Sequence, residues 1–201
     1  MSYSKFTLKR VKQEFNLDII ESQDLFAAIE AVEISDYLRT TLNYNVPLAL
    51  AISTEKARSE LIIANVLLEL KRQLNDQISL FSGINFDVDN DRDLNGFCDY
   101  LLSQSSEQFY LSAPVVAIVE AKNEQVTVGL GQCIAEMIAA KIFNDREGNP
   151  VSRIYGAVTT GNNWKFLKYE GDTVYIDRLE YYIDNVKKIM GILIRMVNLE
   201  A

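Results

Sequence analysis

The spacing of apolar residues predicts a long helix in the second quarter of the chain. After residue 54, apolar side chains recur every three to four positions, which is the spacing of one face of an α-helix. Ser53 or Thr54 can cap its start, because a hydroxyl there accepts a hydrogen bond from a free backbone N–H. The apolar positions are Leu61, Ile62, Val66, Leu70 and Leu74.

Beyond about residue 78 the period changes to two, as expected for strands with one buried face. The segments SLFSGINFDVDND and GFCDYLLSQ lie on either side of the polar cluster at residues 90 to 95, which predicts a β-hairpin. Residues 115 to 119, VVAIV, are apolar without alternation. This strand is therefore expected at the centre of a sheet that is covered on both faces.

A second helix and a second strand pair come next. VGLGQCIAEMIAAKIF has helical spacing and ends before Gly148-Asn149-Pro150. RIYGAVTT and NWKFLKY lie around a turn at residues 161 to 163, and YYIDNVKKIMGILIRMV closes the chain as an amphipathic helix. The order of helix, three strands, helix, two or three strands and helix predicts an α/β layer fold with a mixed sheet.

The first fifty residues mix amphipathic and irregular stretches. DLFAAIEAVEISDYLRTTL (24 to 42) is the most helical of them, and Pro47 is expected to interrupt the helical pattern after it. With 201 residues the chain is long enough for one well-buried core and short for two domains. We expect a single domain over 1–201, with a helical addition at 1–50 and the core at 51–201.

Composition limits the chemistry that the chain can perform. There is no histidine, so a Ser-His-Asp site and a histidine zinc site are excluded. Only Cys98 and Cys133 occur, each in an apolar setting, and we expect both to be buried hydrophobes. No apolar run approaches the roughly 20 residues of a membrane span, and the N-terminus lacks the apolar core of a signal peptide. A cytoplasmic protein without a membrane partner is expected.

Two opposite charges come directly after the central strand. Side chains alternate along a strand, so Glu120 and Lys122 point to one side and Ala121 to the other. Asp99 lies among apolar residues in GFCDYLL on the preceding strand. If these strands pair, Asp99 and Glu120 come within reach of one ion.

Two neighbouring carboxylates repel each other and are costly to bury unless a cation lies between them. Mg²⁺ prefers oxygen ligands, often one or two carboxylates with waters and phosphate, and needs neither histidine nor cysteine. A lysine beside such an ion can orient water and stabilise charge on a phosphate oxygen. The residue types fit metal-assisted attack on a phosphodiester.

On these residues the chain resembles the PD-(D/E)XK, or restriction-endonuclease-like, nuclease superfamily. The resemblance rests on Asp99, on Glu120-Ala121-Lys122 after an apolar strand, and on Gln132 in the next helix. It implies a three-layer α/β/α core with a central mixed sheet flanked by helices. It also implies that Asp99 and Glu120 bind Mg²⁺ or Mn²⁺, that Lys122 assists the attacking water, and that Gln132 lies near the site.

The resemblance further implies an acidic residue on the first core helix, bound to the metal or to its water. Glu60 in ARSELI is the first choice and Glu55 the second, which makes Glu60, Asp99 and Glu120 the implied metal ligands. GAVTTGNNWKF (156 to 166) is similar to the strands after the glutamine helix in proteins of this fold. The matches span roughly residues 55 to 170.

Each candidate also has an ordinary structural interpretation. An E-x-K tripeptide is usually a solvated pair, and Asp99 can end a turn. Glu60 can form a surface pair with Lys56 at i,i+4, and Gln132 can simply be exposed. The basic and aromatic residues of the second hairpin could contact phosphates and bases, but they are more often the core and surface of an ordinary hairpin.

Two functions from different classes remain at this point. The first is a Mg²⁺-dependent nuclease acting on nucleic acid, with DNA favoured over RNA. The second is a non-catalytic module of the same fold that serves as an interaction or structural subunit, with Lys122 as permanent counter-ion of the carboxylates. The net charge of -8 argues against broad attraction to phosphates, so any nucleic-acid contact must be local. A homodimer or a protein partner stays open.

Overall fold

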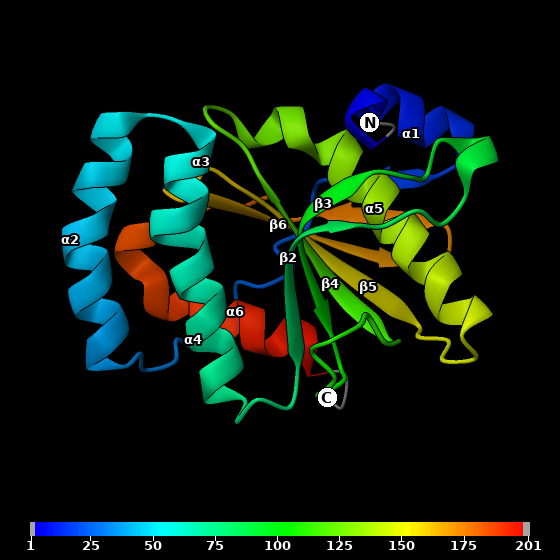
Figure 1. The fold of residues 1–201 in the computed structure, drawn as a ribbon. Helices are drawn as coiled ribbons and strands as arrows, with labels where there is room; N and C mark the ends of the chain where they lie inside the picture. The colour runs from blue at the N-terminus through cyan, green and yellow to red at the C-terminus, as the bar shows by residue number, and fades with distance from the viewer. Residues whose placement is uncertain (1–2, 199–201) are drawn as a thin grey trace.

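A mixed eight-stranded sheet runs through the protein, and helices cover both of its faces (Figure 1). The computed structural model describes residues 3 to 198. The strands are β1 (Asp18–Ile20), β2 (Ser79–Asn85), β3 (Phe97–Ser103), β4 (Val115–Ala121), β5 (Arg153–Thr159), β6 (Asn163–Glu170), β7 (Thr173–Ile176) and β8 (Tyr181–Tyr182). Their order in the sheet is β1-β7-β6-β5-β4-β3-β2, with β8 beside β6.

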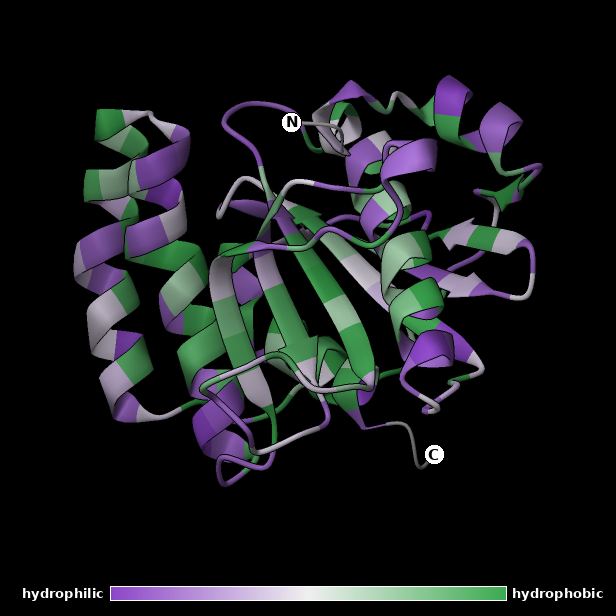
Figure 2. Cartoon of the chain, turned by 45° about the vertical axis from the view of Figure 1, so that its right-hand side comes forward, coloured by the Kyte–Doolittle hydropathy of each residue, from purple (hydrophilic) through white to green (hydrophobic). Residues whose placement is uncertain are grey.

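The helices divide the core into two apolar layers. They are α1 (Leu8–Glu14), α2 (Asp36–Ile52), α3 (Glu55–Arg58), α4 (Ala64–Gln73), α5 (Val126–Arg146) and α6 (Val186–Val197). Buried residues of α2, α4 and α6 form one cluster with one face of the sheet, and those of α1 and α5 form the other. Figure 2 shows the central strands as largely apolar. The α/β class and the mixed sheet predicted from the sequence are therefore confirmed.

The central position of β4 is confirmed. All seven of its residues are buried, with Val119 in the α2, α4 and α6 cluster and Ile118 in the α5 cluster. It pairs antiparallel with β3 and parallel with β5, so α5 serves as the crossover between two parallel strands. The predicted hairpins β2–β3 and β5–β6 are also present.

The first core helix begins as the sequence predicts but contains an irregularity. The Thr54 hydroxyl accepts from the Ala57 N–H at 3.2 Å, and helix then continues from α3 through a π-helical turn, Ser59–Ile63, into α4. The wider turn is supported by Asn65, whose amide donates to the carbonyls of Glu60 and Leu61. Helical periodicity does not reveal such a turn, because the apolar face continues across it.

The prediction of a helix over 24–42 is wrong in its first half. Helix α2 begins only at Asp36, where the Ser35 hydroxyl caps it, and residues 24 to 35 run irregularly across the molecule. In this segment the Lys188 ammonium donates to three backbone carbonyls. These tertiary bonds replace the bonds that a helix would make. They come from α6, far away in the sequence, so local periodicity could not show them.

Pro47 does not interrupt the helix, in contrast to the sequence prediction. It lies inside α2, which continues to Ile52. A proline inside a helix removes one backbone bond and costs about 3 kcal/mol. The inward face of α2, with Leu38, Leu42 and Ala49 buried in the core, offsets this cost.

The N-terminal fifty residues are more closely integrated than a helical addition. Besides α1 they contain β1, which pairs in parallel with β7 at one edge of the sheet. The backbone around Thr7 lies so close to α5 that a Cβ placed on Gly131 would come within 2.4 Å of the Phe6 carbonyl oxygen. The second glycine of VGLGQ is therefore explained by the approach of this segment.

Helix α5 is long and apolar enough, by length and composition alone, to cross a membrane, although no such segment was expected from the sequence. It is a core helix here, with most of its apolar stretch buried against the sheet and α1. This arrangement is consistent with a soluble protein. Both cysteines are free and buried, as predicted.

Candidate functional site

Strands β3 and β4 bring Asp99 and Glu120 together. Tyr100 pairs with Val119 at the end of the antiparallel ladder, and Asp99 and Glu120 are the next residues on the two strands. The Asp99 Oδ2 atom accepts a hydrogen bond of 2.8 Å from the Ala121 N–H, which holds this carboxylate against the end of β4. The predicted proximity of the two acidic residues is therefore present in the structure.

Glu120 is a buried carboxylate with an incomplete set of partners. It is 1% exposed, and its Oε1 atom accepts from the Lys122 ammonium. Its Oε2 atom has no hydrogen-bond partner within residues 3 to 198. Burial, followed by the charge of Asp99, raises the pKa of Glu120 to about 8, although Lys122 acts in the opposite direction. Burial and Asp99 together outweigh Lys122, so the folded protein favours the protonated form of Glu120.

Lys122 is held in place by its backbone, by two side chains and by a glycine. Its N–H donates to the Thr159 carbonyl at 2.8 Å, which ties it to the end of β5. Its ammonium donates to Glu120 and, at 3.3 Å, to the Gln132 Oε1 atom. A Cβ on Gly129 would lie 2.6 Å from the Val158 Cγ1 atom and 3.0 Å from two carbons of the lysine side chain. The first glycine of VGLGQ thus leaves the room that Lys122 occupies.

The charge balance around Lys122 favours its ammonium form. Burial acts to lower the pKa of Lys122, but the charge and hydrogen bond of Glu120, with smaller contributions from Glu55 and Asp99, raise it above its ordinary value. Lys122 is therefore a cation at neutral pH and can stabilise negative charge but cannot serve as a base.

Gln132 lies where the sequence places it, on the second turn of α5, and it is half-buried. Its amide nitrogen donates to the Glu136 Oε1 atom at 3.1 Å. Sequence reasoning missed Glu136, which is fully buried. The available signal was its position: it is the single acidic residue within the apolar run of VGLGQCIAEMIAAKIF and lies one helical turn after Gln132.

Both helix carboxylates, Glu55 and Glu60, are exposed. Glu60 has a side chain that is 62% exposed and forms an ion pair of 3.3 Å with Lys56, which is the surface pair given as its alternative. The charge of Glu55, at the start of α3, raises the pKa of both Glu120 and Lys122. Glu55 is exposed as well, and its charge is the smallest of the contributions named for Glu120, so the choice between Glu55 and Glu60 stays a prediction.

The acidic residues fit a magnesium ion only as a pair. Within residues 3 to 198, no three Asp, Glu or Cys side chains converge into a group that could hold a metal, so the set of Glu60, Asp99 and Glu120 is not assembled. Mg²⁺ is commonly bound by one or two carboxylates, with water completing its octahedron. Glu120 Oε2 is unpartnered within residues 3 to 198, and the charge of Asp99 reaches Glu120, so the pair has the oxygen ligands that such an ion uses.

The second hairpin is a core element. Trp164 and Phe166 are fully buried, and Lys168 pairs with Glu170 at 2.7 Å. The ordinary interpretation of its alternating aromatic residues is thus confirmed, and these two rings are not available to stack on bases.

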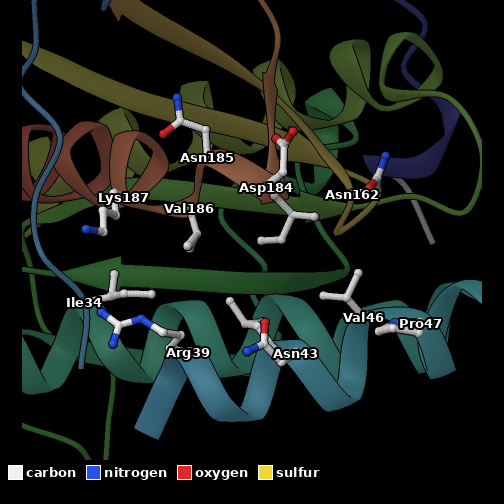
Figure 3. Close-up of a pocket in the computed structure, with 12 residues that line it drawn as sticks. Ile34, Arg39, Asn43, Val46, Pro47, Asn162, Asp184, Asn185, Val186 and Lys187 are labelled. Atoms are coloured by element: carbon white, nitrogen blue, oxygen red, sulfur yellow. The ribbon is translucent and has the colours of Figure 1, made fainter. Parts of the chain in front are cut away.

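A cavity of about 550 Å³ lies apart from these residues, between α2 and the start of α6 (Figure 3). Its lining includes Leu42 and Val46 from α2, Val186 from α6, and Asn162 from the turn after β5. None of the candidate site residues lines it. The site at the end of the central strands combines the buried Glu120 with Asp99 and Lys122, which are half-buried.

A comparison of the chain with protein-family models, with curated proteins and with solved structures found no match. The chemistry of the site is therefore inferred from its own residues. These are a buried carboxylate without enough counter-charge, a second carboxylate at the same level, and a lysine fixed beside them.

Proposed function

We propose that the chain is a Mg²⁺-dependent nuclease of the PD-(D/E)XK type. The observation that carries this proposal is the buried Glu120 carboxyl, whose Oε2 atom is unpartnered and whose pKa is raised to about 8 by burial and by Asp99. A buried acid of this kind is destabilising unless a cation joins it. The order of elements around the mixed sheet also supports a restriction-endonuclease-like, three-layer core.

In this proposal Asp99 and Glu120 hold the ion, with water as its remaining ligands. A bound Mg²⁺ would supply charge stabilisation for the phosphate and a more acidic water. The chain itself supplies orientation: the backbone N–H of Ala121 fixes Asp99, and the pairing of Glu120 with Val158 of β5 fixes the level of Glu120. Both carboxylates are thus set before substrate arrives, so little reorganisation is needed.

Lys122 is the residue that contacts the attacking water or the phosphate. An ammonium has three N–H donors, and within residues 3 to 198 two of them are used by Glu120 and Gln132. The third is left for a water molecule or a phosphate oxygen. Because Lys122 keeps its proton, its role is to position the nucleophile and to stabilise developing charge rather than to accept a proton.

Nucleic acid, with DNA first, is the substrate that this chemistry implies. The net charge of -8 makes extended contacts with phosphates unfavourable, so the ion and Lys122 have to provide most of the attraction. Binding to long duplexes that is insensitive to salt would contradict this arrangement. A cytoplasmic setting, a homodimer and a protein partner remain predictions.

A non-catalytic module of the same fold is the second candidate. The ion pair between Lys122 and Glu120 favours it, because that pair already neutralises part of the cluster without a metal. In this case Lys122 is a permanent counter-ion, and Mg²⁺ neither binds nor raises the melting temperature.

Calorimetric titration with Mg²⁺ and Mn²⁺ separates the two candidates. We expect binding to the wild type, and loss of binding in Glu120→Gln and in Asp99→Asn, which keeps an oxygen for the Ala121 N–H. Glu60→Gln is the matched control, because Glu60 is exposed and paired with Lys56, and it should bind as the wild type does. Cleavage of single- and double-stranded DNA and RNA should accompany metal binding. A wild type that binds neither ion would refute the nuclease and favour the module.

A further inference from the structure

A continuous chain of side-chain contacts leads from the site into the core. It runs from Glu120 to the Lys122 ammonium, from Lys122 to the Gln132 Oε1 atom at 3.3 Å, and from the Gln132 Nε2 atom to the Glu136 Oε1 atom at 3.1 Å. Gln132 and Glu136 lie one turn apart on the same face of α5. Glu136 is thus two contacts away from the ammonium that the proposed reaction uses.

The orientation of the Gln132 amide depends on what lies at each of its ends. Lys122 has only donors to offer, so the amide must present its oxygen to the lysine. Its NH₂ group then faces Glu136 and needs an acceptor there. The carboxyl of Glu136 provides one whether it is charged or neutral, because a protonated carboxyl keeps one carbonyl oxygen. In the opposite orientation, the NH₂ group would face the ammonium, donor against donor.

We propose that Glu136 is a positioning residue: it accepts from the Gln132 amide, sets its orientation and thereby holds the Lys122 ammonium against Glu120. This inference rests on the proposed function for its catalytic consequence. The contact between Glu136 and Gln132 can be tested whether or not the protein cleaves nucleic acid.

The burial of Glu136 supports a role other than stability. Its side chain is fully buried, and its Oε2 atom has no partner within residues 3 to 198. Burial, followed by the charge of Glu120, raises the pKa of Glu136 well above its ordinary range. A methionine of similar volume would remove this unfavourable group, so the core itself would be more stable without the acid.

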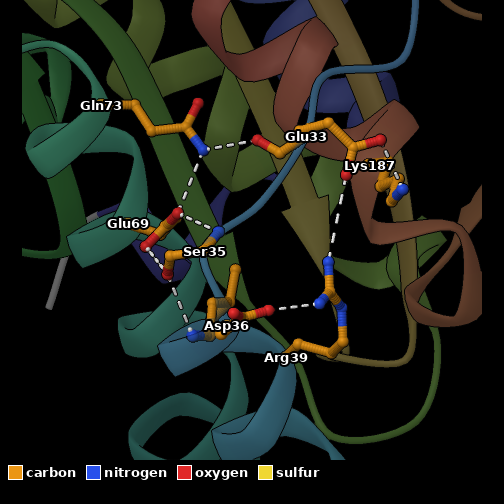
Figure 4. Close-up of polar contacts among 8 residues, drawn as sticks. Glu33, Ser35, Asp36, Arg39, Glu69, Gln73 and Lys187 are labelled. Atoms are coloured by element: carbon orange, nitrogen blue, oxygen red, sulfur yellow. Dashed lines mark hydrogen bonds and ion pairs between the residues drawn. The ribbon is translucent and has the colours of Figure 1, made fainter.

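Glu69 on α4 shows how this protein buries a glutamate for structure (Figure 4). It is 2% exposed, yet both of its oxygens have partners: it accepts from Ser35 through the backbone N–H and the hydroxyl, each at 2.8 Å, and from Gln73 and Arg72. It closes the capped start of α2. Glu136 has one hydrogen bond where Glu69 has four. Glu69 is therefore the matched control.

The test compares Glu136→Met, Glu136→Gln and Glu69→Met. For Glu136→Met we expect a higher melting temperature, a kcat about 10- to 100-fold lower and an unchanged KM. For Glu136→Gln, which keeps an acceptor oxygen, we expect a kcat within about threefold of the wild type. For Glu69→Met we expect a lower melting temperature and an unchanged kcat per folded molecule. A purely structural Glu136 would behave like Glu69 and overturn the proposal. Equal losses of kcat in both Glu136 variants would overturn it as well, because the charge would then act directly.

Side-chain NMR of the Gln132 NH₂ group reports the orientation itself. In the wild type its protons should show contacts with the γ-protons of Glu136 and slow exchange with water. Both signs should persist in Glu136→Gln and disappear in Glu136→Met. If the wild type cleaves no nucleic acid, the proposed function fails while this readout still decides the contact: an NH₂ group unchanged in Glu136→Met overturns the positioning role.

Discussion

Glu120→Gln should change the pH dependence of stability in a defined direction. The ordinary pKa of the carboxyl is 4.5, and the folded protein raises it to about 8. Between these values the folded state keeps a proton that the unfolded chain has lost. The free energy of unfolding therefore falls as pH rises from about 4.5 to about 8, and this contribution is constant outside that window.

The magnitude is set by the difference between the two pKa values. One pKa unit corresponds to about 1.4 kcal/mol. Between pH 4.5 and pH 7 the Glu120 carboxyl ionises in the unfolded chain but stays largely protonated in the folded protein, which lowers the stability of the wild type by about 3 kcal/mol. Glutamine has the shape of the protonated acid and does not titrate. The free energy of unfolding of Glu120→Gln should accordingly match the wild type near pH 4.5 and exceed it by about 3 kcal/mol at pH 7.

Urea unfolding of both proteins at half-unit steps from pH 4.5 to 7.5, with EDTA present, measures this difference. The other ionisable residues are the same in both proteins, so the difference between the two curves reports Glu120 together with its effect on Lys122 and Glu136. The same titration is then repeated with saturating Mg²⁺. A bound cation favours the carboxylate form of Glu120, so the free energy of unfolding of the wild type should rise and depend less on pH, while that of Glu120→Gln stays unchanged. Parallel curves in EDTA would refute the assignment of Glu120 as a buried acid with excess negative charge around it.

Three further substitutions test particular contacts. Gly129→Ala places a Cβ 2.6 Å from the Val158 Cγ1 atom and 3.0 Å from two carbons of Lys122, so we expect a loss of about 1–3 kcal/mol in stability and a weaker metal site, measured by urea unfolding and calorimetry. Pro47→Ala restores a backbone donor inside α2 and should raise the free energy of unfolding by about 1–3 kcal/mol; a lower melting temperature would contradict this. Tyr3→Phe removes the donor that bonds the Phe86 carbonyl at 2.7 Å and should cost about 1–2 kcal/mol, with no change in metal affinity.

Much of the fold could be predicted because its signals are local. The helix after Thr54 and the strand VVAIV are each indicated by spacing within one short segment, and both are present in the structure. The position of Asp99 opposite Glu120 needed only one more assumption, that consecutive strands pair. Such pairing is the commonest connection between neighbouring strands, and it holds here.

The errors lie where distant parts of the chain meet. Residues 24 to 35 have helical spacing, but Lys188 of α6 binds their carbonyls and they stay irregular. Pro47 is tolerated because α2 has a core to pack on.

Local spacing and composition were enough to predict the class of fold, the buried central strand and the types of residue at its end. Periodicity reports which side of a helix or strand is apolar, and the absence of histidine restricts the chemistry to oxygen ligands and lysine. The folded chain was needed to show that Glu120 has an unpartnered oxygen, that Gly129 makes room for Lys122 and that Glu136 supports Gln132 from the core. These are properties of packing between β4 and α5, and the burial and charge of a group depend on all the elements around it rather than on its neighbours in the chain.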